Sequence, residues 1–108
     1  MNSRIMYIEY KGDNLTGNAR IGRGRFSKTM KSIRYDGKLF ISLKGAGFKS
    51  NFYDEESGEE YWISGCKKDG SDRLYNENSP ILIDEDVQEE YWKEIRNMPK
   101  MVGTLRIN

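Results

Sequence analysis

The chain has 108 residues, a formal net charge of +1, 36% hydrophobic and 32% charged residues, one cysteine and no histidine. This length predicts one domain, whose modest core needs most of the large apolar side chains. The absence of histidine excludes Ser-His-Asp and Cys-His catalysis, histidine-based zinc sites and an imidazole pH switch. The single Cys66 excludes an intrachain disulfide and a cysteine-rich metal cluster.

The first segments have the composition of short strands. Residues 4–11 are rich in β-branched and aromatic residues, and the apolar side chains at even-numbered positions share one face. Residues 19–27 predict a second strand. Gly22 and Gly24 inside it indicate a bulge, a sharp bend or a close approach of another part of the chain.

The sequence predicts two β-hairpins after these strands. In residues 32–43, Asp36-Gly37 separates two β-prone runs and favours a type I′ turn, which needs positive φ at both positions. Residues 48–65 predict another hairpin, with Gly58 suited to a left-handed position in its loop. The acidic residues that bracket this loop are typical of a solvated hairpin tip.

The C-terminal part changes to a helical period. After a short strand at 81–83, apolar side chains recur at helical spacing in residues 84–97, which predict one helix. Asp84 or Asp86 is the expected cap of its first turn. Pro99 should end it, and residues 98–108 are expected to be a tail or a last strand.

These elements predict a mainly β (α+β) fold. We expect a small, bent antiparallel sheet or partly open, SH3-like barrel, with one helix in its C-terminal region. Residues 1–108 form a single predicted domain, whose core spans about 4–97.

The tetrapeptide Glu-Glu-Tyr-Trp occurs at 59–62 and again at 89–92. Strand alternation sends Tyr61 and Trp62 to opposite faces of a sheet, whereas the helix places both rings of its copy on one face. We therefore expect two structural uses of one string, with Trp92 packing the helix near one of Tyr61 and Trp62. The other ring is the better candidate for an exposed binding residue.

Charge is distributed unevenly along the chain. Residues 1–50 hold eleven Lys/Arg against three Asp/Glu (+8), and residues 51–108 hold seven against fourteen (−7). Such an asymmetry favours either a basic face for an anionic partner or mutual neutralisation of the two halves within one sheet.

A basic stretch with interleaved aromatic residues spans residues 20–49. Basic strands with exposed rings bind single-stranded nucleic acid by phosphate contact and base stacking. In a domain this small, the same rings are also expected core residues. The candidate binding residues are Arg20, Arg23, Arg25, Lys28, Arg34, Lys44, Lys49, Phe48, Tyr61 and Trp62.

Several segments carry a resemblance to a known group of proteins: ARIGR and RFSKT within 19–29, SLKGAGFKSN at 42–51, GEEYWISGCKKDGSDRLY at 58–75 and IDEDVQEEYW at 83–92. Over roughly residues 5–97 the chain resembles a family of small bacterial proteins, some labelled 1-deoxy-D-xylulose-5-phosphate synthase. The chain is several times too short for the cofactor domains of such an enzyme. The resemblance implies a bulkier residue at Gly24 and glycine at Met30.

These observations lead to three functional hypotheses. The first is a non-enzymatic cytosolic binding module for an unknown protein partner. The second is binding of single-stranded RNA or DNA through residues 20–49. The third is a small enzyme that uses carboxylates, tyrosine or lysine. We expect no cofactor, no bound metal, no membrane association and no signal peptide, and the sequence indicates no oligomeric state. Cys66 is expected to be a half-buried, structural thiol.

Overall fold

The computed structural model describes residues 2–11, 18–43, 50–73 and 79–107. Its strands are β1 (Asn2–Tyr10), β2 (Ala19–Phe26), β3 (Ser32–Tyr35), β4 (Lys38–Ser42), β5 (Phe52–Asp54), β6 (Glu60–Gly65), β7 (Ile81–Ile83) and β8 (Arg106–Ile107). Its helical segments are α1 (Gln88–Glu90), the π-helical turn η1 (Tyr91–Ile95) that continues it, and the 3-10 turn η2 (Pro99–Met101).

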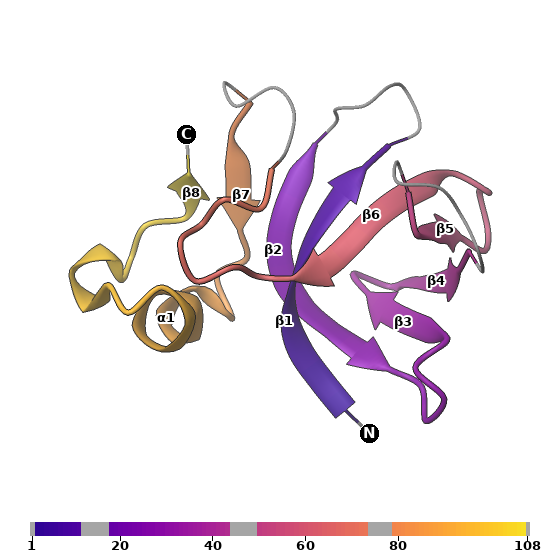
Figure 1. Ribbon diagram of the computed structural model, residues 1–108, viewed down its shortest axis with the longest axis horizontal. Helices are drawn as coiled ribbons and strands as arrows, with labels where there is room; N and C mark the ends of the chain where they lie inside the picture. Colours follow the sequence, from indigo (N-terminus) through magenta and orange to yellow (C-terminus); the bar gives the residue numbers. More distant parts are fainter. Residues whose placement is uncertain (1, 12–17, 44–49, 74–78, 108) are drawn as a thin grey trace.

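Strands β1 to β6 form a closed antiparallel barrel, in the order β1-β6-β5-β4-β3-β2, which the pairing of β1 with β2 completes (Figure 1). On the side away from β1, strand β2 pairs with two different strands. Its last residues, 25–26, pair with β3, whereas residues 19–21 pair in parallel with β7 outside the barrel. The predicted mainly β fold with a C-terminal helix is confirmed, and the predicted alternative of a last strand is realised by β8.

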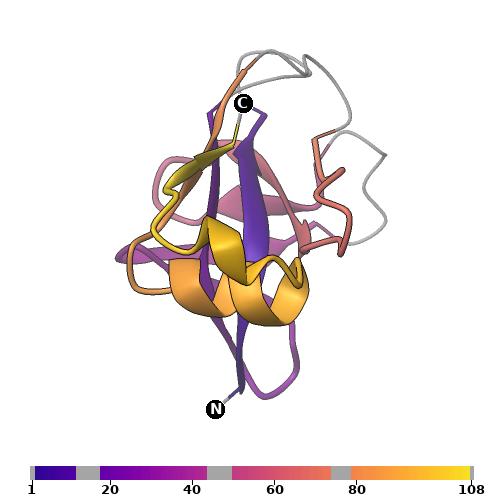
Figure 2. The ribbon, with the colours of Figure 1, turned by 90° about the vertical axis from the view of Figure 1, so that its left-hand side faces the viewer.

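The departure of β2 from β3 gives the molecule two cores on opposite faces of β1. The inner core lies inside the barrel and consists of Met6, Ile8, Phe26, Ile33, Phe40 and Ile63. The outer core lies between the barrel wall and the helical segment and consists of Ile5, Tyr7, Ala19, Ile21, Ile81, Ile83, Val87, Tyr91 and Trp92. Figure 2 shows the helical segment covering this side of the barrel. Both faces of β1 are therefore buried from Ile5 to Glu9.

The two copies of Glu-Glu-Tyr-Trp have different settings, as predicted. Tyr61 packs against the inner core and Trp62 against the outer core, because successive strand residues point to opposite faces. Tyr91 and Trp92 are both buried in the outer core. Trp92 thus belongs to the same core as Trp62, and Tyr61 is the ring left on the other face of the sheet.

Three turn positions have the backbone that the sequence predicts. Asp36 and Gly37 have φ of 52° and 75°, which fits the predicted type I′ turn, and Gly58 has φ of 78°. Met30 also has a positive φ, 63°, in the turn between β2 and β3. The left-handed conformation favours glycine, so Met30 has a backbone conformation that methionine rarely adopts.

The predicted cap of the C-terminal helix is wrong. The N-cap position is Val87, one residue after Asp86 and three after Asp84, and no side chain there forms a hydrogen bond to the first turn. The carboxylate of Asp84 instead accepts hydrogen bonds from Arg20 and Tyr35. A charged partner on the barrel therefore outcompetes the helix terminus for this side chain.

The two oppositely charged halves of the chain neutralise each other in part. Arg20 pairs with Asp84 at 2.6 Å, and Arg23 with Glu90 at 2.7 Å. In the part of the chain that the structure describes, no helix has the length and apolar character needed to cross a bilayer.

Candidate binding site at the barrel mouth

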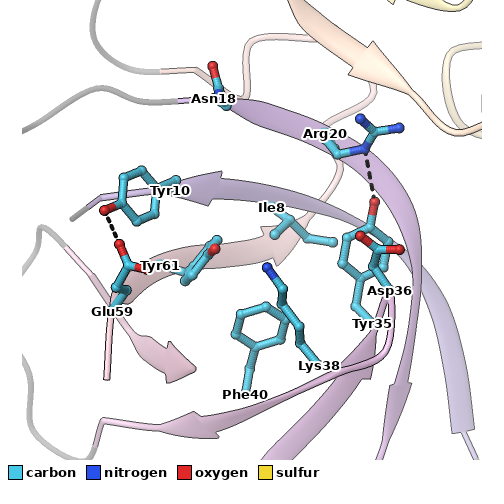
Figure 3. Close-up of a pocket in the computed structure, with 10 residues that line it drawn as sticks. All are labelled: Ile8, Tyr10, Asn18, Arg20, Tyr35, Asp36, Lys38, Phe40, Glu59 and Tyr61. Carbon is cyan, nitrogen blue, oxygen red and sulfur yellow. Dashed lines mark hydrogen bonds between the residues drawn. The ribbon is translucent and has the colours of Figure 1, made fainter. Parts of the chain in front are cut away.

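A cavity of about 310 Å³ opens where β2 diverges from the β3–β4 hairpin, at one mouth of the barrel (Figure 3). Its floor is Ile8 of the inner core. Its walls come from β1, β2, the β3–β4 hairpin and the start of β6. The lining residues are Ile8, Tyr10, Asn18, Arg20, Tyr35, Asp36, Lys38, Phe40, Glu59 and Tyr61.

Aromatic rings line one side of this cavity as a continuous row. Tyr61 stands between Tyr10 and Phe40, with ring centroids 5.4 Å and 4.8 Å away and interplanar angles of 65° and 68°. Edge-to-face contacts of this kind hold rings in fixed orientations. The row therefore presents a preformed apolar wall, with the Tyr10 hydroxyl donating a hydrogen bond to Glu59 at its end.

Some of the charged groups at the cavity form hydrogen bonds or ion pairs with other side chains, and one does not. Glu59 accepts the Tyr10 hydroxyl, and Arg20 is engaged by Asp84. The Lys38 ammonium group makes no hydrogen bond or ion pair with any other residue that the structure describes. Figure 3 shows its amine directed into the cavity, above Phe40. An ammonium group beside an aromatic wall suits a ligand with both an apolar part and a negative charge.

A brace of three side chains closes the outer side of the mouth. Arg20 donates to Asp84 Oδ1 through Nε at 2.9 Å and Nη2 at 2.6 Å, and the Tyr35 hydroxyl donates to Asp84 Oδ2 at 2.6 Å. The brace passes directly over Gly22: a Cβ atom there would lie 2.9 Å from Tyr35 Cζ and closer still to Asp84. Glycine in β2 thus permits the close approach that the sequence indicated.

Two of the cavity's tyrosines are held in the neutral form. Burial, followed by the hydrogen bond to Asp84, raises the pKa of Tyr35, and burial raises the pKa of Tyr61. Both hydroxyls are protonated at neutral pH, and the Tyr35 hydroxyl donates to Asp84.

A second depression adjoins the cavity on the outer face of β2 and β3. This groove, of about 360 Å³, is lined by Arg23, Arg25, Arg34, Tyr35, Asp36, Gly37, Lys38 and Asp86. Tyr35, Asp36 and Lys38 line both the cavity and the groove, so the two form a continuous depression around the tip of the β3–β4 hairpin.

The structure brings together only some of the residues that the sequence nominated. Arg20 and Tyr61 line the cavity, and Arg23, Arg25 and Arg34 line the groove. Lys28 is exposed in the turn after β2, away from both. Trp62 packs against the outer core. The candidates Lys44, Phe48 and Lys49 lie outside the described residues.

Several residues at the mouth were not identified from the sequence. Tyr10 reaches the cavity because its strand alternation continues beyond the inner core, a signal that the pattern at 4–11 contains. Asp36 lies in the turn whose type was predicted, and Lys38 follows it. Asp84 lies 64 residues after Arg20 in the chain, and only the pairing of β7 with β2 brings the two together.

A cluster of buried charges lies on the other face of β1. The carboxylate of Glu9, 2% exposed, accepts hydrogen bonds from the Tyr7 hydroxyl at 2.5 Å, the Lys11 ammonium at 2.8 Å and Arg73 at 3.5 Å. Arg73 also donates to the carbonyl of Pro80. Glu9 therefore ties the segment after β6 to the barrel wall.

Cys66 is half-buried beside the outer core, as expected for a structural thiol. Burial, with a smaller contribution from the nearby Asp72 carboxylate, raises the pKa of the Cys66 thiol to about 12. The thiolate is the nucleophilic form, so this environment suppresses the reactivity of the thiol.

We expect Cys66 to react with iodoacetamide at pH 8 at least about tenfold more slowly than a free thiol, because a thiol with an ordinary pKa is far more ionised at this pH. Mass spectrometry of timed samples measures the rate. The same protein in urea is the control and should react at the free-thiol rate. Equal rates in the two conditions would show that the folded protein does not protect Cys66.

Among residues 2–11, 18–43, 50–73 and 79–107, no group of three or more His, Cys, Asp or Glu side chains could hold a metal ion. The mouth of the barrel presents an aromatic wall, tyrosine hydroxyls and charged side chains. In comparisons with known proteins, no family model, curated protein or solved structure matches this chain.

Proposed function

We propose that this protein is a non-enzymatic binding module that takes an apolar side chain of a protein partner into the barrel-mouth cavity. The observation that carries the proposal is the row of Tyr10, Tyr61 and Phe40 beside an opening of about 310 Å³. This volume is at the small end of ligand pockets and suits one side chain of a peptide.

The residue types at the mouth support a protein partner. Tyrosine and arginine are enriched among the residues that dominate protein–protein affinity, since they combine a large apolar area with a polar group. Small barrels of the SH3-like kind bind extended peptides in aromatic-lined grooves, and the cavity offers the same type of surface. We place the module in the cytosol, where a lone cysteine stays reduced.

A binding role is favoured over catalysis at this cavity. Asp36, Lys38 and Glu59 are the groups that an enzyme of the third hypothesis would use. Glu59 is already engaged by Tyr10, and the pKa of Tyr61 is raised, which removes the phenolate needed for a base or nucleophile.

A protein partner is also favoured over single-stranded nucleic acid. Phe26 from the basic stretch is buried in the inner core, so its ring offers no free face for base stacking. Arg20 and Arg23 are partly neutralised by Asp84 and Glu90. These contacts weaken the positive field that phosphate binding requires.

The proposal is tested by selecting binders from a random dodecapeptide library on the wild-type protein and measuring their affinity by calorimetry. We expect Tyr61→Ala to weaken the selected peptides by at least about tenfold, because it removes the centre of the aromatic wall. Tyr53→Ala is the matched control: Tyr53 lies on the neighbouring β5 and is not part of the cavity lining. It should bind like the wild type.

A second variant separates loss of binding from loss of folding. Lys38 is exposed at the rim, so Lys38→Trp should fill the cavity without disturbing the inner core. We expect it to block the same peptides while keeping the wild-type near-ultraviolet circular dichroism spectrum. Undiminished binding to a folded Lys38→Trp variant, or a library that yields no binder, would refute the proposed function.

A further inference from the structure

The groove on β2 and β3 contains an arrangement that stability alone does not explain. Arg25 and Arg34 are direct cross-strand partners, both exposed, on the outer face of the barrel. Like charges directly opposite each other destabilise an antiparallel pair. Neither guanidinium forms a hydrogen bond or ion pair with another residue in the described parts of the chain.

Both basic and acidic side chains surround this arginine pair, so they add to its positive potential and also limit it. Arg23 lies two residues before Arg25 on the same face of β2, and Lys38 lies at the end of the groove that meets the cavity. Against the four cations of the lining stand Asp36 and Asp86. Glu90 further neutralises Arg23 at 2.7 Å.

This charge balance indicates the size of the anion. Four cationic and two acidic side chains line the groove, which leaves an excess of two positive charges, or one when Glu90 is included. One or two carboxylates are sufficient to balance such an excess. A nucleic-acid backbone, with one negative charge on each phosphate, would meet the acids as well as the arginines.

We infer that the peptide bound at the barrel mouth is acidic, and that Arg25 and Arg34 together bind one of its side-chain carboxylates. This inference rests on the proposed function. The planar guanidinium group matches a carboxylate, and two of them can each donate paired N–H groups to one anion. The cavity and groove are continuous, so one segment places an apolar side chain against Tyr61 and an Asp or Glu beside Arg34.

The test uses the dodecapeptides selected on the wild-type protein. We expect Asp and Glu to be enriched on one side of a conserved apolar position. The double variant Arg25→Gln/Arg34→Gln should bind these peptides at least about tenfold more weakly, since it removes two charged donors. Lys28→Gln/Lys31→Gln is the matched control. It removes the same charge from the exposed turn that joins the two strands, and it should keep wild-type affinity.

Charge reversal gives a stricter version of the same test. A selection on Arg25→Glu/Arg34→Glu should return Lys or Arg at the position where the wild type selects Asp or Glu. A measurement without ligand supplements it: Arg34→Gln should raise the urea midpoint, because it relieves the repulsion with Arg25. The double variant and the single variant change only exposed side chains, so we expect both proteins to keep the fold.

The outcomes separate this inference from the proposed function. If the glutamine double variant binds every selected peptide as tightly as wild type while Tyr61→Ala does not, the inference is wrong and the proposed function stands. If Tyr61→Ala binds as wild type does, the proposed function fails. If 12-nucleotide oligo(dT) or oligo(U) binds more tightly than any peptide and depends on Arg25 and Arg34, the ligand is nucleic acid and the inference is overturned.

Discussion

Glu9→Ala should lower the free energy of unfolding by about 3–5 kcal/mol, the range for removing one member of a buried ion pair. The variant leaves the buried Lys11 and Arg73 without the carboxylate that both contact. It also removes the acceptor of the buried Tyr7 hydroxyl. Small domains are stable by about 5–15 kcal/mol, so this loss is a large part of the total. Urea unfolding followed by tryptophan fluorescence measures it.

Two further variants make the result interpretable. Glu89→Ala removes a carboxylate from the exposed pair with Lys93, and the urea midpoint should stay at the wild-type value because exposed pairs contribute little. Glu9→Gln keeps the shape and one acceptor oxygen but no charge, so it should be less destabilising than Glu9→Ala. An unchanged midpoint for Glu9→Ala would show that the cluster does not hold the segment after β6 to the barrel.

Gly22→Ala is expected to destabilise the protein by about 2–3 kcal/mol, within the range for overpacking a filled interior. The added methyl group would overlap the Tyr35 ring and the Asp84 carboxylate, well inside the 3.0 Å that Cβ contacts respect. The brace over the barrel mouth has to move away from β2 to accommodate it. Chemical denaturation measures the loss, and peptide affinity should fall with it because Tyr35 lines the cavity.

Gly65→Ala is the matched control for this change. Gly65 lies in β6 with nothing within 4 Å of an added Cβ, so alanine should leave stability unchanged or slightly higher. In the Tyr35→Ala background the Gly22→Ala change should cost less, since the ring that it overlaps is gone. Equal losses in the two backgrounds would contradict the assigned contact.

The sequence predicted those parts of the fold that depend on near neighbours. The turn at Asp36-Gly37 follows from residue types that tolerate positive φ, and Gly58 follows for the same reason. The opposite settings of the two Glu-Glu-Tyr-Trp copies follow from the different periods of strand and helix. The alternation that places Tyr61 on the inner face is also local, which is why this candidate lies in the site.

The binding site was only partly predictable. Arg23 and Arg25 were both candidates from the sequence; they are two residues apart on β2, share a face by strand alternation, and both line the groove. The sequence did not indicate that Arg34 would stand directly opposite Arg25, because that register depends on how β2 meets β3. It also left open which of Tyr61 and Trp62 would lie beside Trp92 of the helical segment, and the structure places Trp62 there.

Local pattern alone determined that this protein is mainly β with a C-terminal helix, a type I′ hairpin and two Tyr-Trp pairs in different structural settings. Tertiary structure decided where β2 leaves β3 to pair with β7, and that divergence opens the cavity. It also decided that Asp84 binds Arg20 and Tyr35 and caps no helix. The physical reason is that both outcomes depend on contacts between segments far apart in the chain, which short-range propensity and periodicity do not encode.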